Sequence, residues 1–138
     1  MPSDIRITTA TLAGRQTASS GSKWEPIMGY SRAVRSGNVI AVTGTVGVNA
    51  DGTYPPTLED QARRSLQIIR AALEALGGRV EHVIRTRMFV TDVSKWEQVA
   101  RVHGEVFKDI RPATTIVEVA KLIDKDAMIE IEADAVVP

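Results

Sequence analysis

The sequence predicts an α+β fold in which a mixed sheet of five or six strands packs two helices on one face. Two stretches repeat apolar residues at helical spacing, and the segments around them are β-branched with alternating polarity. These elements follow one another as strand, strand, helix, strand, helix, strand, strand. Right-handed crossovers between strands of one sheet place both helices on the same face, so this order predicts a two-layer sandwich.

A hairpin and a long helix are the first elements of this pattern. Residues 30–44 hold two strand-like runs joined by Ser36-Gly37-Asn38, which has the composition of a tight turn. Further on, Thr57 and Asp60 have the spacing of a helix start, and Gly77-Gly78 is a typical helix end. Between these signals one apolar stripe runs at helical spacing: Leu58, Ala62, Leu66, Ile69, Leu73 and Leu76.

A strand, a second helix and two further strands complete the pattern. Residues 82–92 are β-branched and aromatic, with apolar side chains in both alternating sets, so both faces of this strand are expected to be covered. Ser94 and Glu97 indicate a second capping box. Pro112 disfavours helical geometry at Arg111, so the chain turns there into the final strands. The second helix is predicted to turn these residues inward: Trp96, Val99, His103, Val106, Phe107 and Ile110.

Acidic residues alternate with apolar ones along the final strands, within residues 111–122 and 129–137. One set is expected to face the helices: Val117, Val119, Ile129, Ile131 and Ala133. The other set then faces away from them: Thr114, Ile116, Glu118, Glu130, Glu132 and Asp134. No helix of the pattern covers that second face, and the apolar residues on it favour burial against a partner subunit. Each acid there needs a partner such as Arg32, Arg85 or Arg87, or an ordered water.

The composition is that of one globular domain. The 138 residues are 43% hydrophobic and 25% charged, so we expect a single domain over residues 1–138 with an N-terminal arm at 1–25. The 17 basic and 17 acidic residues cancel, which leaves no broad footprint for nucleic acid. No apolar run has membrane-spanning or signal-peptide character, so a cytoplasmic protein is expected. The absence of cysteine excludes disulfides, thiolate catalysis and cysteine-ligated metals.

Four segments carry a family resemblance: VTGTVGV, RTRMFVTDVSKW, RPATTIVEVAKL and IEIEADAVV. Together they resemble the Rid family, the reactive-intermediate deaminases that are also called YjgF or endoribonuclease L-PSP-like proteins. The similarity covers roughly residues 28–137. The resemblance implies a chorismate-mutase-like fold and a homotrimer whose sheets line a central barrel. Clefts between the subunits would bind small 2-imino or enamino acids and hydrolyse them to 2-keto acids and ammonia, with no cofactor and no metal.

The resemblance also implies a set of pocket residues. The family's acid, which positions or activates the hydrolytic water, corresponds to Glu130. Its cleft tyrosine corresponds to Tyr30, and its small residue in the hairpin strand corresponds to Thr43. The small cleft-lining position of the strand that follows the second helix is Ile116, and an asparagine common on that helix is Ala100 in this chain.

One position departs from the family pattern. Deaminase members read PARS, and the arginine clamps the substrate carboxylate through paired, charge-assisted hydrogen bonds. This chain reads Pro112-Ala113-Thr114-Thr115, so the arginine position is Thr114, whose hydroxyl carries no charge. Arg32 and Arg87 are the candidates to replace the clamp. Arg32 lies two residues after Tyr30 and shares its face if the strand is regular.

Each of these residues also has a purely structural interpretation. Glu130 is then a strand acid that forms a salt bridge across subunits, and Arg32 and Arg87 pair with surface acids. The threonines at positions 43 and 114 are ordinary strand formers. His103 lies on an apolar stripe and is expected to be a buried, hydrogen-bonded imidazole. His82 has no companion at metal-ligand spacing, so no metal site is expected.

Three functions remain consistent with the sequence. The first is a hydrolase acting on C=N bonds, an imine or enamine deaminase with altered specificity for an imino, enamino or oxo compound. The second is a non-catalytic binder or regulatory trimer for such small molecules, in which loss of the arginine ended the chemistry. The third is an endoribonuclease, against which the neutral charge and the lack of a basic, aromatic-bearing groove argue.

Overall fold

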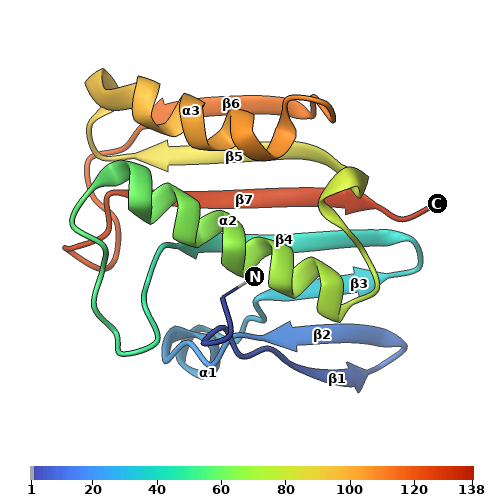
Figure 1. The fold of residues 1–138 in the computed structure, drawn as a ribbon. Coiled ribbons are helices and arrows are strands. Elements are labelled where there is room, and N and C mark those ends of the chain that lie inside the picture. Colours follow the sequence, from blue (N-terminus) through green and yellow to red (C-terminus); the bar gives the residue numbers. More distant parts are fainter. Residues whose placement is uncertain (1) are drawn as a thin grey trace.

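A computed structural model describes residues 2–138 and shows a seven-stranded sheet with two long helices on one face (Figure 1). The strands lie in the order β1-β2-β3-β4-β7-β5-β6, and among these neighbours β5 and β6 run parallel while the other pairs are antiparallel. The elements are β1 (Thr8–Leu12), β2 (Arg15–Ser19), α1 (Trp24–Met28), β3 (Ala33–Ser36), β4 (Val39–Val46), α2 (Leu58–Ala75), β5 (Val83–Val90), α3 (Trp96–Phe107), β6 (Ala113–Glu118) and β7 (Ile129–Val136), with 3₁₀ turns at Val80–His82 and Val93–Lys95.

The predicted class is confirmed, and the sheet is larger than the five or six strands expected. The additional strands come from residues 8–19 of the predicted arm, which form a hairpin on the free edge of β3. Left-handed backbone at Ala13 (φ 52°) and Gly14 (φ 77°) makes the turn of this hairpin. Every residue of β1 is exposed, so this strand lacks the apolar alternation by which a sequence indicates a strand.

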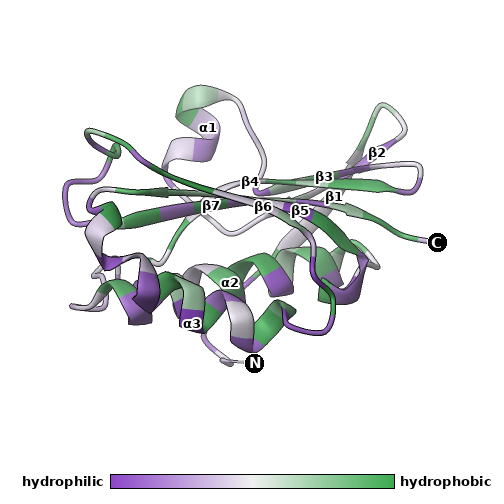
Figure 2. Cartoon of the chain, turned by 90° about the horizontal axis from the view of Figure 1, so that it is seen from above, coloured by the Kyte–Doolittle hydropathy of each residue, from purple (hydrophilic) through white to green (hydrophobic). Residues whose placement is uncertain are grey.

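The hydrophobic core lies between the sheet and helices α2 and α3. Every second residue of β7 is buried: Ile129, Ile131, Ala133 and Ala135. The predicted start of α2 is confirmed, because the Thr57 side chain accepts a hydrogen bond from the Asp60 N–H, and Gly77 follows the helix with a left-handed φ of 80°. Figure 2 shows α2 and α3 on one side of the sheet and α1 on the other. No helix within residues 2–138 is long and apolar enough to cross a membrane.

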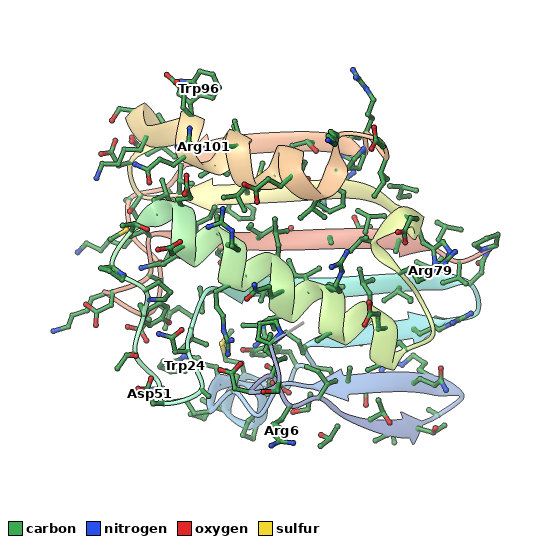
Figure 3. All side chains as sticks on the ribbon, viewed as in Figure 1. Arg6, Trp24, Asp51, Arg79, Trp96 and Arg101 are labelled. Atoms are coloured by element: carbon green, nitrogen blue, oxygen red, sulfur yellow. The ribbon has the colours of Figure 1, made fainter. Side chains whose placement is uncertain are left out.

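The start of α3 differs from the prediction. The Asp92 carboxylate accepts hydrogen bonds from the N–H and the hydroxyl of Ser94, so Ser94 is capped rather than capping, and a 3₁₀ turn precedes the helix. The helix then begins at Trp96, whose side chain points away from the sheet and is 52% exposed (Figure 3). The prediction that Trp96 faces inward is therefore wrong. The buried residues of α3 are Val99, Val102 and Phe107.

The orientation predicted for β6 is also wrong. The parallel register joins Thr114 to Thr86, Ile116 to Met88 and Glu118 to Val90. Paired residues share a face, and these β5 residues are buried under the helices, so the three β6 side chains lie on the helix side. Val117 alternates to the other face and is 41% exposed. The Glu118 carboxylate accepts a hydrogen bond from the Val93 N–H rather than lying among the other acids.

Candidate active site

Glu130 lies near the start of β7, on the face of the sheet away from the helices, where it pairs with Val46 of β4 and Phe89 of β5. Its side chain is half-buried, and no group within residues 2–138 forms a hydrogen bond or an ion pair with its carboxylate. The carboxyl group lies against the backbone of Gly44, where an added Cβ would come within 2.7 Å of Cδ of Glu130. Glu130 is thus confined in position while its oxygens remain available to a ligand or a water.

The surroundings of Glu130 favour its neutral form. Burial raises the pKa of its carboxyl above the ordinary value of 4.5, and the negative charge of Glu132 raises this pKa further. The guanidinium of Arg32 acts in the opposite direction. A carboxyl with a raised pKa exchanges protons at near-neutral pH more effectively than an exposed one, which is the property of a general acid or base.

Arg32, one of the predicted clamp residues, is largely engaged in holding the fold. It is 6% exposed, its Nε donates to the Ser20 hydroxyl at 3.0 Å, and its Nη1 donates to the Gly44 carbonyl at 2.8 Å. The same Nη1 lies 3.3 Å from the Thr45 hydroxyl. These bonds fix the backbone of Gly44. They therefore also fix the surface against which the Glu130 carboxyl lies.

Glu25 of α1 is the buried counter-charge of Arg32, a pairing that sequence analysis missed. Its Oε2 lies 3.9 Å from Nη2 of Arg32 and accepts hydrogen bonds at 3.2 to 3.3 Å from the N–H and hydroxyl of Ser20 and from the N–H of Ser22. The other neighbour of Nη2 is the Tyr30 hydroxyl, at 3.5 Å. Nη2 is therefore the Arg32 nitrogen whose donors are used least by the protein.

Tyr30, Thr43 and Arg87 line an open groove of about 1020 Å³ on the face of the sheet away from the helices. Nη1 of Arg87 lies 3.2 Å from the Asp134 carboxylate and 3.7 Å from that of Glu132. Within one chain, Arg87 therefore pairs with acidic residues, as its structural interpretation predicts.

Thr114 and Ile116 lie on the opposite face of the sheet from Glu130. They belong to β6, the edge strand at the end of the sheet opposite the β1–β2 hairpin (Figure 1). The Thr114 hydroxyl contacts the Thr86 hydroxyl at 2.8 Å, on the helix side of the sheet. A single chain therefore does not bring the predicted site residues together: Glu130 and the groove residues share one face, and the β6 residues lie at the far edge of the other.

A second pocket, of about 410 Å³, lies between residues 4–6, the segment before α1, the loop after β4, and α2. Its walls include Trp24 and Tyr54, together with Arg64, whose guanidinium pairs with Asp4 at 3.0 Å. Burial and the Asp124 carboxylate, which accepts a hydrogen bond from the Tyr54 hydroxyl, raise the pKa of Tyr54. No motif predicts this pocket, because its walls come from segments far apart in the sequence.

The chain matches a known protein family over most of its length. The family model described as Endoribonuclease L-PSP matches residues 20–137. The chain is a member of this family. Its match includes Tyr30, Glu130 and the buried Arg32–Glu25 pair, whereas β1 and β2 precede the matched residues. The resemblance found in the sequence is confirmed, and it begins earlier in the chain than expected.

Proteins of known name or structure resemble this chain over most of its length. Rv2704 of Mycobacterium tuberculosis, described as a member of the YjgF/YER057c/UK114 family, has a TM-score of 0.83 at 44% identity, covering 89% of this chain and 99% of that one. The 2-iminobutanoate/2-iminopropanoate deaminase of Escherichia coli K12 is 38% identical over 111 residues, 78% of this chain and 86% of its own. TdcF of Escherichia coli, solved with bound serine, has a TM-score of 0.74 at 32% identity, covering 79% of this chain and 88% of that one.

Proposed function

We propose that this chain is a hydrolase that converts a reactive imine or enamine to a carbonyl compound and ammonia, with Glu130 as its catalytic acid and base. The observation that carries the proposal is the Glu130 carboxyl, which is half-buried against Gly44 and has no protein partner within residues 2–138. A carboxylate with a purely structural role is expected to be paired. Its neighbours Glu132 and Asp134 are paired, through Arg87.

The hydrolysis of a C=N bond needs proton transfers that one carboxyl group performs in sequence. The Glu130 carboxylate removes a proton from water as the water oxygen bonds to the imine carbon, and it returns this proton to the imine nitrogen. The resulting carbinolamine then breaks its C–N bond. As the C=O bond forms, the hydroxyl proton passes through Glu130 to the departing nitrogen, which leaves as ammonia. An enamine enters the same route once its carbon gains a proton and its nitrogen gives one up, which leaves the imine.

In this proposal a second copy of the chain completes the cleft. Glu130 and the groove with Tyr30 and Thr43 lie on one face, while Thr114 and Ile116 lie on the helix side of an edge strand. A homotrimer in which the β6 edge of one copy meets the open face of the next would place these residues around one small molecule. The relatives support a small substrate, since one is named an imine deaminase and another was solved with bound serine.

The test is the release of ammonia from 2-iminobutanoate and from the neutral 2-iminobutanamide, each generated in the assay. Glu130→Gln should lower kcat/KM by about 100-fold or more, because it removes proton transfer and leaves the shape of the site. The matched control is Glu74→Gln, the same change on the exposed end of α2, which should leave kcat/KM unchanged.

Two results would contradict this proposal. Equal activity of Glu130→Gln and the unaltered protein would remove Glu130 from the mechanism. Binding of these compounds without any acceleration of ammonia release would instead identify the chain as a non-catalytic binding protein, the alternative that the uncharged Thr114 favours. Light scattering checks the shared cleft, since an active monomer would exclude it.

A further inference from the structure

Three polar side chains form a continuous hydrogen-bonded row from α3 to the edge of the sheet. Nε2 of His103 lies 2.9 Å from the Thr86 hydroxyl, and this hydroxyl lies 2.8 Å from that of Thr114. The Thr114 hydroxyl also lies 3.3 Å from the carbonyl of Pro112, to which it can donate. His103 was expected to be a buried, hydrogen-bonded imidazole. Its hydrogen bond is confirmed, but the residue is only half-buried, and its partner connects it to the position that corresponds to the arginine of the deaminase members.

The placement of the protons along this row determines whether the Thr114 hydroxyl acts as a donor or an acceptor toward a ligand. If Thr86 donates to His103, then Thr86 accepts from Thr114, and the only Thr114 hydroxyl proton points to Thr86. If His103 donates to Thr86, then the Thr86 proton is free for Thr114, and the Thr114 proton has the Pro112 carbonyl, at 3.3 Å, as its acceptor within the protein. In both arrangements the Thr114 proton has an acceptor within the protein. The outward side of the Thr114 oxygen therefore presents lone pairs, whichever nitrogen of His103 carries its proton.

The row also supplies no positive charge in place of the arginine. Thr86 is 0% exposed, and burial lowers the pKa of His103 below its ordinary value, which favours the neutral imidazole. A carboxylate offers only lone pairs, and it would meet the lone pairs of Thr114 without a compensating cation from this row. An amide or another neutral group with an N–H can donate to the same oxygen.

We propose that Thr114 makes the cleft selective for neutral ligands that present a hydrogen-bond donor where a carboxylate would be expected. This inference rests on the proposed function, because it takes Thr114 to line the cleft. The substrate class that follows is an imine or oxo compound whose carboxylate is replaced by an amide or a similar N–H group.

Three probes of nearly equal size test this selectivity by calorimetry on the full chain: 2-oxobutanoate, 2-oxobutanamide and methyl 2-oxobutanoate. They present a charged acceptor, a neutral donor and a neutral group without a donor. The amide should bind about tenfold more tightly than either of the others, which corresponds to about one net hydrogen bond. Thr114→Val should remove the preference for the amide over the ester, whereas Thr114→Ser, which keeps the hydroxyl, should retain it.

The outcomes separate this inference from the function on which it rests. Tightest binding of 2-oxobutanoate would overturn the selectivity and leave the proposed hydrolase intact. Binding of none of the three probes would overturn the placement of Thr114 in the cleft, and the inference with it. An amide preference that persists in a folded Thr114→Val variant would show that another residue sets it. Thermal melting of both variants establishes that they fold.

Discussion

Replacing Gly44 by alanine tests the position of Glu130 directly. The added Cβ would lie 2.7 Å from Cδ and 2.8 Å from Oε1 of Glu130. Ordinary van der Waals contact begins near 3.4 Å, so the carboxyl group must move by about 0.7 Å. The displaced atoms are the end of a flexible side chain, and the φ of Gly44 lies outside the left-handed region. We therefore expect the free energy of unfolding to change by less than about 1 kcal/mol.

Catalysis should be far more sensitive than stability to this displacement. A misplacement of about 1 Å in a catalytic group can cost about 100-fold in rate, so kcat/KM for imine hydrolysis should fall by about that factor in Gly44→Ala. The matched control is Gly104→Ala on α3, where an added Cβ meets nothing within 4 Å. This control should keep full activity, and a urea titration of both variants should show that each is folded.

A double variant shows whether Gly44 acts through Glu130. In the Glu130→Gln background, Gly44→Ala should cause little further loss, because both changes remove the same carboxylate from its working position. Two results would refute the reasoning: Gly44→Ala with nearly unaltered kcat/KM, or two losses that multiply in the double variant.

Two further predictions concern the charges around the site. The value of kcat/KM should fall as the pH drops through the pKa of Glu130, because the carboxylate is the base, and the midpoint should lie above 4.5. Glu132→Gln should lower this midpoint by removing a like charge, and a pH–rate profile with an unmoved midpoint would contradict the coupling. Arg32→Met should reduce the free energy of unfolding in urea by about 3 kcal/mol, because it leaves the buried Glu25 carboxylate without its counter-charge. The matched change at Arg87, in a partly exposed ion pair, should cost less than about 1 kcal/mol, and equal losses at the two positions would disprove this ranking.

The elements that the sequence predicted well have strong local signals. The start of α2 is marked by Thr57, whose side chain caps this helix. The apolar residues of α2 repeat at helical spacing because only one face of the helix is buried. The β7 strand alternates strictly because helices cover one of its faces. The β1–β2 hairpin has no such signal, since its first strand is exposed throughout. Such a segment becomes a strand through its hydrogen bonds to the neighbouring strand. The hydrophobic pattern of the sequence does not show which strands pair.

The candidate site was predicted less well than the fold, because the orientation and burial of its side chains depend on tertiary packing. The sequence shows that Glu118 and Glu130 both lie on strands, but it does not show that β6 is an edge strand whose parallel register turns Glu118 toward the helices. The buried position of Arg32 depends on Glu25 of the short helix α1 and on Ser20 of the irregular segment before it. In the sequence, only the family resemblance distinguishes Glu130 from the other acids. Its lack of a partner is visible only in three dimensions.

The separation of Glu130 and Thr114 on opposite faces has a consequence for assembly. A contact between the face of one copy and the edge of the next is heterologous, so it ends only when the copies close into a ring. Each chain would then contribute to two clefts between subunits, with the Glu130 carboxylate in one and the Thr114 hydroxyl in the other. A mixed assembly of chains altered at Glu130 and chains altered at Thr114 would consequently contain some clefts with both residues intact, which neither variant forms alone.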